Sequence, residues 1–251
     1  EFLLRHESPT DLLTASDHLL LLVLFYGLFF GPVTVKTLNY FVLAPLARRA
    51  PPIIINAVDG AWQDRIRYDT PHNEFSIQLQ GSDSLVVKPG WYSLNTDGVT
   101  RTRFFWKLSD PFAYYAMGLV HMIEFKQDDD SARVIKIGCE DDHNQSILPI
   151  HLYDHPGYVI RQGHVVATTG NELRMKKQWR IMDWKSWLFG NIRYVYFAGT
   201  GTLYISGYGQ VSVNESAIDS RIKENHVIGF DTRTPVKMLR TETFANYWLN
   251  R

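Results

Sequence analysis

The sequence has little cysteine and no net charge. Cys139 is the one cysteine among 251 residues, and a lone thiol excludes an internal disulfide and a multi-cysteine zinc site. The 26 Lys and Arg residues balance the 26 Asp and Glu residues. A protein that binds nucleic acid mainly through its phosphates is usually basic, so we expect no DNA binding. A charged fraction of 21% and an aromatic fraction of 14% exclude a disordered chain.

Charge is also missing locally, from residues 19–33, which read LLLLVLFYGLFFGPV. A helix of that length rises about 22 Å, less than the roughly 30 Å of a hydrocarbon core. Apolar residues resume after Lys36 and Asn39. We therefore expect an N-terminal segment, 1–50, whose residues 19–46 form a transmembrane or membrane-docked helix. A helix or helical hairpin docked on a partner protein is the alternative.

The membrane-anchor prediction rests on large apolar side chains along this segment. Gly31-Pro32 is the expected kink. Arg48 and Arg49 follow the segment, whereas acidic residues precede it, so the positive-inside rule places the globular part in the cytoplasm or, in an organelle, the matrix. Because the sequence starts at Glu1, a removed presequence is a further expectation. The expected anchor residues are Leu19, Leu22, Phe25, Phe29, Phe30, Phe41 and Leu46.

The rest of the chain, 51–251, reads as one β-rich domain. Short alternating runs such as YVIRQGHVVA are rich in Val, Ile, Tyr and Thr and are broken by Gly, Pro, Asn and Asp. Only three stretches have a helical character, and they are 111–121, 181–189 and 241–251. The pattern predicts an all-β fold with an N-terminal hydrophobic helix.

Three segments of this domain align without gaps, namely 86–104, 159–177 and 221–239. Each reads as a strand, a turn with a left-handed residue, and a strand; the turn residues are Gly90, Gly163 and Asn225. Residues 122–140 and 194–210 both read as hairpins. The repetition predicts three antiparallel sheet modules around a pseudo-threefold axis. Further glycines are expected in structural turns: Gly199, Gly201, Gly207 and Gly209.

These turn motifs carry a family resemblance. The stretch VIRQGHVVATTGNELRM, followed by YFAGTGTLYISGYGQVSV, resembles the altered-inheritance-of-mitochondria family. The resemblance covers about 75–238 and is best over 158–230. It implies a fold similar to the tryptophan-RNA-binding attenuator protein and, for eukaryotic members, the mitochondrial inner membrane. The family supplies no catalytic residues. The acidic DDDSA turn at 128–132 departs from it.

Basic and aromatic residues alternate at 101–107 and 174–180, at equivalent ends of two repeats. Cations with aromatics are typical of membrane interfaces, protein interfaces and RNA stacking. The alternative is a sheet edge with protective charges above buried aromatic rings. The predicted interaction edge consists of Arg101, Arg103, Trp106, Lys107, Arg174, Lys176, Lys177, Trp179, Trp184 and Trp187.

No motif indicates a catalytic, cofactor or metal site. Residues 139–143 (CEDDH) are the densest set of possible ligands, but neighbours on a strand point to opposite faces. The glycine pairs lack the helix and the Lys-Ser/Thr that phosphate binding requires. His155, His164 and His226 have no nucleophile or acid beside them in the sequence. We therefore expect no catalytic residue, no cofactor and no metal.

The sequence thus predicts a non-catalytic, membrane-anchored structural or accessory subunit, or an assembly factor, of a mitochondrial inner-membrane complex. Its expected partners are other subunits of that complex and the lipid bilayer, with the globular domain on the matrix side. An RNA-binding or ribosome-associated β module is the first alternative. A weaker one is an enzyme acting on a membrane-soluble substrate.

Overall fold

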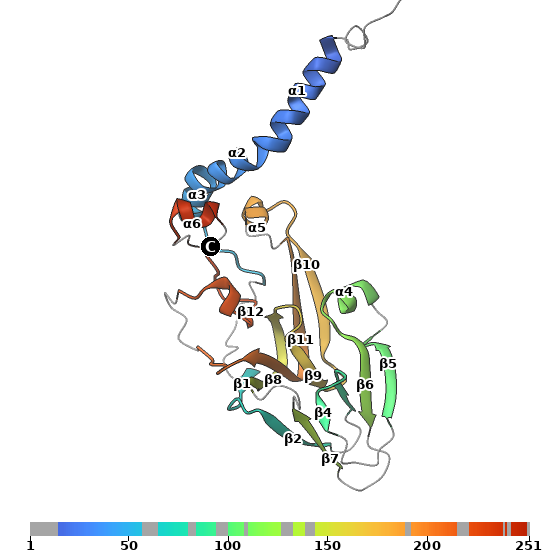
Figure 1. The fold of residues 1–251 in the computed structure, drawn as a ribbon. Helices are drawn as coiled ribbons and strands as arrows, with labels where there is room; N and C mark the ends of the chain where they lie inside the picture. Colours follow the sequence, from blue (N-terminus) through green and yellow to red (C-terminus); the bar gives the residue numbers. More distant parts are fainter. Residues whose placement is uncertain are drawn as a thin grey trace, which may run out of the picture. The chain divides into compact units, whose positions relative to one another are not determined.

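The computed structural model describes residues 15–56, 65–79, 84–93, 100–107, 110–126, 133–138, 144–188, 192–214, 221–237, 239 and 242–249 (Figure 1). The chain divides into two compact units. The helical unit comprises Glu1–Ile53, Met182–Asn191 and Val236–Arg251, and the β unit comprises Ile54–Ile181 and Ile192–Pro235. The second and third parts of the helical unit belong to the region that the sequence pattern assigns to the β domain.

The helical unit contains α1 (Ala15–Phe29), α2 (Gly31–Leu38), the π-helical turn η1 (Asn39–Leu43), α3 (Ala44–Arg49), α5 (Trp184–Leu188) and α6 (Phe244–Trp248). Pro32 stands in the first turn of α2. A proline there removes an N–H that would bond back into α1, so the helix bends. The bend between Asp17–Phe29 and Gly31–Arg49 is 52°, which agrees with the expected kink at Gly31-Pro32.

The β unit has twelve strands in its described residues. They are β1 (Ile66–Tyr68), β2 (Glu74–Leu79), β3 (Ser84–Val87), β4 (Tyr92–Ser93), β5 (Thr100–Phe105), β6 (Val120–Lys126), β7 (Arg133–Gly138), β8 (Gln145–Ile160), β9 (Val165–Thr169), β10 (Arg174–Trp179), β11 (Arg193–Tyr208) and β12 (Gly229–Asp231). The short helix α4 (Pro111–Ala116) and a 3-10 turn, η3 (Glu224–His226), complete it. The prediction of an all-β fold with an N-terminal helix is confirmed in this coarse form.

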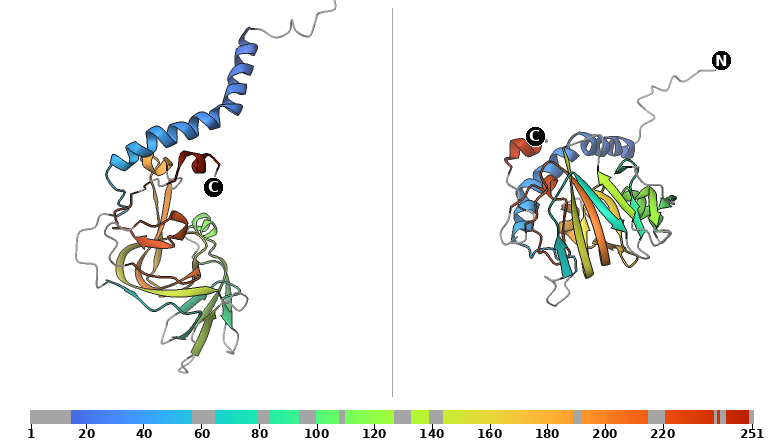
Figure 2. Two further views of the ribbon diagram at one scale, coloured as in Figure 1. Left: turned by 60° about the vertical axis from the view of Figure 1, so that its left-hand side comes forward. Right: turned by 90° about the horizontal axis from the view of Figure 1, so that it is seen from below.

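The long strands β8 and β11 form the centre of the larger sheet and run antiparallel from Tyr196↔Val159 to Tyr208↔Gln145 (Figure 2). In the described part of the chain this sheet has nine strands, ordered β1-β8-β11-β9-β3-β6-β5, with β10 added to β11 and β12 added to β8. All pairings that join it are antiparallel. The separate three-stranded sheet has the order β2-β7-β4.

Successive residues of β8 and β11 pack alternately into two hydrophobic cores. Leu148, Ile150 and Leu203 belong to the first, together with Trp106 and Tyr114 near α4. Ile147 and Tyr204, on the opposite face, belong to the second, which includes side chains of β2 and β7 in the small sheet. The period-two alternation that predicts strands therefore also assigns their residues to the two layers.

The pseudo-threefold repeat is not confirmed, because the three aligned segments form different local structures. In 159–177 the strand, turn and strand of the prediction are present as β8, a turn at Gly163 (φ 89°) and β9. In 86–104 Gly90 is also left-handed (φ 80°), but β3 and β4 lie in different sheets. In 221–239 Asn225 lies in the 3-10 turn η3 and not in a left-handed turn, which corrects that prediction.

Neither predicted hairpin forms. Residues 194–210 lie almost wholly in the continuous strand β11, and the strands of 122–140, β6 and β7, belong to different sheets. Gly199 and Gly201 stand where β11 changes its neighbour from β10 to β9, within a pair of register shifts. Gly207 lies near the end of β11, where a Cβ would come 2.6 Å from Ile228 and Val211. Gly209 follows β11 with a φ of 73°.

Glycine is required at 199 because the β9–β10 connection passes close to β11 there. Gly199 has a φ of 108°, and a Cβ would lie 2.5 Å from the carbonyl oxygen of Glu172. Gly209→Ala is the matched control, since Gly209 is also left-handed (φ 73°) but has open space around it. We expect Gly199→Ala to cost about 3 kcal/mol and the control about 1 kcal/mol.

Thermal unfolding of the full-length chain in mild detergent measures the difference. For a protein of this size the expected falls in melting temperature are about 9 °C for Gly199→Ala and about 3 °C for Gly209→Ala. Equal falls would contradict the close approach of Glu172 as the reason for the glycine.

Candidate functional site

The predicted anchor residues are all exposed in the helical unit. Their exposed fractions run from 49% for Leu46 to 67% for Leu19 and Leu22. Every residue from Asp17 to Phe30 is exposed, so the apolar side chains surround α1 on all sides and do not form one stripe. A helix that is apolar all round belongs in a fully apolar environment.

Polar side chains of α1 and α2 have partners inside the same segment. The Thr34 hydroxyl donates to the carbonyl of Phe30 at 2.9 Å, and the Thr37 hydroxyl donates to Val33 at 2.8 Å. The Tyr26 hydroxyl lies 3.4 Å from that of Thr34. In the described residues no single helix is long and apolar enough to cross a membrane, but the bent pair Asp17–Phe29 and Gly31–Arg49 meets the requirement in length and composition.

A cluster that the sequence does not reveal joins this segment to the C-terminal helix. The Tyr40 ring lies 5.1 Å from Phe244 and 5.7 Å from Tyr247, and its hydroxyl donates to the carbonyl of Glu242 at 3.0 Å. Lys36 Nζ donates to the carbonyl of Trp248 at 3.1 Å. We name this cluster the aromatic collar; it consists of Lys36, Tyr40, Phe41, Phe244, Tyr247 and Trp248.

The predicted interaction edge does not lie within one unit. Trp184 and Trp187 stand exposed on α5 in the helical unit, whereas the other members belong to the β unit. The spacing along the chain cannot show this division, because 182–191 leaves the β unit between two paired strands, β10 and β11.

Two members of the predicted edge are structural. Trp106 is only 3% exposed and packs against Tyr114 and Phe197 at ring distances of 5.8 and 5.7 Å, so it is not an interaction residue. The Arg103 guanidinium donates two hydrogen bonds, of 2.6 and 2.7 Å, to the buried carboxylate of Glu124. Removal of Arg103 would leave a buried charge, so we assign it to folding. Glu124 is distant in sequence, which explains why the motif did not reveal it.

Two lysines of the predicted edge fasten the end of β5 and the start of α4 to β10. Lys107 donates to the carbonyl oxygens of Leu173 at 2.7 Å and Asn171 at 3.2 Å. Burial, with the nearby charges of Arg174 and Arg103, lowers the pKa of Lys107. Lys177 pairs with Asp110, the N-cap residue of α4, and its hydrogen bond lowers the pKa of that carboxyl.

The members of the edge that remain exposed in the β unit are Arg101, Arg174, Lys176, Lys177 and Trp179. The guanidinium of Arg193 lies 5.5 Å from the Trp179 ring, within the range of a cation–π interaction. In the described residues β10 pairs with β11 alone. The charges therefore follow a sheet edge, as the alternative interpretation of this motif expects.

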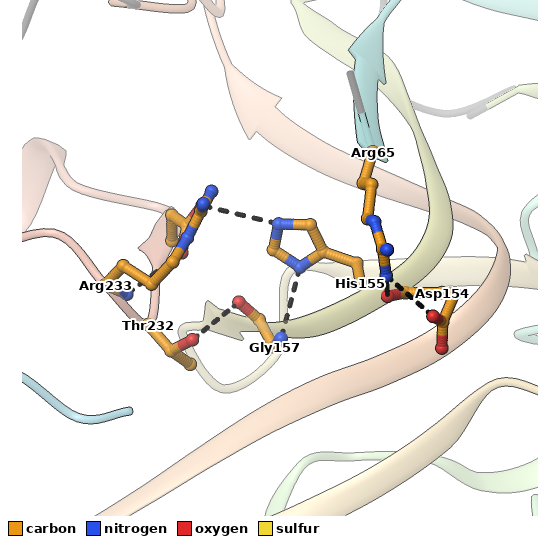
Figure 3. Close-up of polar contacts among 7 residues, drawn as sticks. Arg65, Asp154, His155, Gly157, Thr232 and Arg233 are labelled. Atoms are coloured by element: carbon orange, nitrogen blue, oxygen red, sulfur yellow. Dashed lines mark hydrogen bonds and ion pairs between the residues drawn. The ribbon is translucent and has the colours of Figure 1, made fainter. Parts of the chain in front are cut away.

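A buried polar network surrounds His155 at the bend of β8 (Figure 3). The backbone N–H of Gly157 donates to His155 Nδ1 at 3.1 Å, so the neutral ring carries its proton on Nε2. Nε2 lies 3.3 Å from Asp231 Oδ2, without the alignment of a full hydrogen bond. Arg233 pairs with the same carboxylate, and Thr232 donates to the carbonyl of Gly157 at 3.0 Å. The network holds β12 on β8.

A second network contains His151, which the sequence pattern does not single out. Its Nε2 lies 3.0 Å from Asp69 Oδ2, and its Nδ1 lies 2.9 Å from the Thr202 hydroxyl. The row resembles a hydroxyl–imidazole–carboxylate relay. However, β11 is paired on both edges at Thr202, with His151 and Thr169 as its neighbours. The backbone N–H groups there are engaged in the sheet, so they do not form the oxyanion hole that a catalytic relay needs.

The histidines that the sequence singled out contact different residues. His155 belongs to the buried network, His164 Nδ1 lies 2.7 Å from the carbonyl of Ser206, and His226 is exposed in η3. In the part of the chain that the structure describes, no group of three or more His, Cys, Asp or Glu residues could hold a metal ion. The possible ligands at 139–143 lie outside the described residues.

The Asp231 network makes stability depend on pH. Burial alone would raise the pKa of Asp231, but the contacts from Arg233 and His155 outweigh it and hold this pKa well below its usual value of 3.8. A carboxyl whose pKa is lower in the folded than in the unfolded protein stabilises the fold at any pH above its unfolded pKa. This contribution is lost as the pH falls from the unfolded pKa through the folded pKa. Asp231→Asn should therefore melt below the wild type at pH 7, with the difference shrinking below about pH 4.

The measurement is the melting temperature of both proteins from neutral to acid pH. Asp231→Asn keeps the size and shape of the side chain, removes its charge and replaces one acceptor oxygen with an NH2 donor. Parallel pH profiles for the two proteins would contradict a stabilising charge at Asp231.

Comparison of the chain with protein-family models, curated proteins and solved structures gives no match.

Proposed function

We propose that this chain is a membrane-anchored, non-catalytic structural or accessory subunit, or an assembly factor, that acts by binding other proteins. The observation that carries the proposal is α1, whose side chains from Asp17 to Phe30 are all exposed although 19–33 is free of charge. Isolated exposed apolar residues are ordinary, but a continuous apolar surface of this size marks an interface with lipid or protein.

Lipid fits this surface better than a protein groove does. A groove covers one side of a helix and would leave the opposite side of α1 in water. Leu19, Leu20, Leu21 and Leu22 are consecutive and at least half exposed, and together they point to every side of the helix. The internal partners of Thr34 and Tyr26 also suit a medium that offers no hydrogen bonds.

Charges at the two ends of the segment support an orientation. Asp17 precedes the apolar run, whereas Lys36, Arg48 and Arg49 follow it. The positive-inside rule then places the following part of the chain in the cytoplasm or the matrix. The resemblance to the altered-inheritance-of-mitochondria family, with its pseudo-threefold fold, supports the mitochondrial inner membrane, and the positive-inside rule then favours the matrix side.

Exposed aromatic side chains on α4 and β5 support binding to a protein partner. Phe112 is 84% exposed and Tyr115 71% exposed on α4, and Phe104 is 60% exposed on the adjoining β5. Aromatic residues are enriched at protein interfaces. We favour this over RNA binding because Arg103, Lys107 and Lys177 of the predicted edge are engaged within the fold.

Charge inside α1 tests the membrane proposal. An acidic residue at the centre of a membrane helix costs about 3 kcal/mol. Leu24→Asp with Leu28→Asp should therefore move most of the protein from the membrane pellet to the soluble fraction after an alkaline wash. The control is Val134→Asp, a change at an exposed position of β7, which should leave the protein in the pellet. Retention of the α1 variant would overturn the anchor.

Purification in mild detergent tests partner binding. We expect the wild type to migrate with other proteins in a complex well above its own mass. Phe112→Ala with Tyr115→Ala should weaken this complex, because both aromatic side chains are exposed; Tyr153→Ala, at another exposed position of the β unit, should not. Recovery of the wild type only as a monodisperse monomer would contradict the proposal.

A further inference from the structure

The aromatic collar combines the side chains that favour the boundary between lipid and water. Tyr40, Tyr247 and Trp248 have apolar rings with one polar group each, and Lys36 has an apolar stem with a charged end. Phe41 and Leu249 beside them remain 58% and 59% exposed. Exposed apolar surface next to hydroxyl, indole and ammonium groups is typical of the headgroup level, where Trp and Tyr are enriched.

The distance from the start of the apolar run to the collar matches the thickness of a membrane. Residues 19–29 rise 1.5 Å each along α1, and the helix after the 52° bend advances only about 0.9 Å per residue along the same axis. Residues 19–39 then cover about 26 Å, close to the roughly 27 Å hydrocarbon core of a thin bilayer. Tyr40 therefore falls where the hydrocarbon ends.

Lys36 is the one charge within these residues, and its contacts bring it to the same level. Its ammonium donates to the carbonyl of Trp248 and lies 5.8 Å from the Trp248 ring. That carbonyl is at the C-terminal end of α6, where a cation is favoured. A lysine four residues before Tyr40 thus reaches toward the boundary, as lysines near the ends of membrane helices do.

We propose that the collar lies at the phospholipid headgroup level, so that 19–39 crosses the hydrocarbon and α6 is a second contact of the chain with the membrane. This inference rests on the proposed membrane anchor and deepens it. The occupant of the exposed collar surface is a phospholipid headgroup, since Arg48 and Arg49 of α3 follow the collar and complement anionic lipids. The end of the N-terminal helical segment, in α2 and η1, and the last helix, α6, then meet at one surface of the bilayer.

The single cysteine makes the test direct. In a Cys139→Ser background, one new cysteine is introduced at an exposed position and coupled to an environment-sensitive fluorophore. The positions are Leu249 beside α6, Leu28 in α1, and Val134 in β7 as the control outside the membrane. The full-length protein is reconstituted into phosphatidylcholine vesicles with some phosphatidylglycerol, which carry nitroxide lipids labelled either just below the headgroup or deep in the acyl chain.

We expect the label at Leu249 to be quenched at least twofold more by the shallow nitroxide than by the deep one. The label at Leu28 should show the opposite order, and the label at Val134 should be quenched by neither. Adding Trp248→Ala should reduce the shallow quenching at Leu249, whereas Tyr153→Ala, at an exposed position of the β unit, should not. The inference is overturned if the Leu249 label behaves like the Val134 label while the Leu28 label is quenched. Loss of quenching at Leu28 would instead contradict the proposed anchor itself.

Discussion

The antiparallel pairing of β8 with β11 is the constraint on which the β unit depends. The two 16-residue strands bond to each other along most of their length, and each provides its other edge to two further strands. β1 and β12 attach to β8, while β9 and β10 attach to β11. In each case the two further strands pair one after the other along the same edge. Gly199 and Gly201 lie between the pairings of β11 with β10 and with β9, and Asp154, with a φ of 46°, accompanies the bend of β8.

The same pairing explains why the buried polar network has a structural function. His155 occupies the bend of β8; Gly157 of the same strand donates to its Nδ1, and the carboxylate of Asp231 in β12 lies 3.3 Å from its Nε2. A buried polar group costs free energy unless it is paired, so the network specifies where β12 attaches. The network of Asp69, His151 and Thr202 lies farther along β8 and β11, where Thr202 and His151 are directly paired. Both networks follow from the register of β8 with β11.

Local patterns in the sequence predict the β class, the kink at Gly31-Pro32 and the turn at Gly163, because each depends on residues that are close in the chain. Partners distant in the chain were not predictable. The AGTGT glycines indicate a tight turn when read locally, but Gly199 is needed because of the nearby carbonyl of Glu172, in the connection between β9 and β10. Trp106 and Arg103 look like surface residues beside basic neighbours, and only the fold brings Phe197 and Glu124 to them. The repeat is not confirmed for the same reason, since the three similar segments have different neighbours in the fold.

The aromatic collar is another contact between residues that are distant in the chain, and it bears on the proposed function. The apolar run predicts an anchor from composition alone, but it does not show where an anchor ends, because Lys36 interrupts it and Leu46 extends it. The contact of Lys36 and Tyr40 with α6 indicates where the proposed anchor ends. A lysine inside an apolar helix is costly in hydrocarbon, and the carbonyl of Trp248 gives its ammonium a partner in the direction of water. The interruption in the sequence is thereby compatible with the proposed anchor, and in that proposal it marks the depth at which the chain would leave the bilayer.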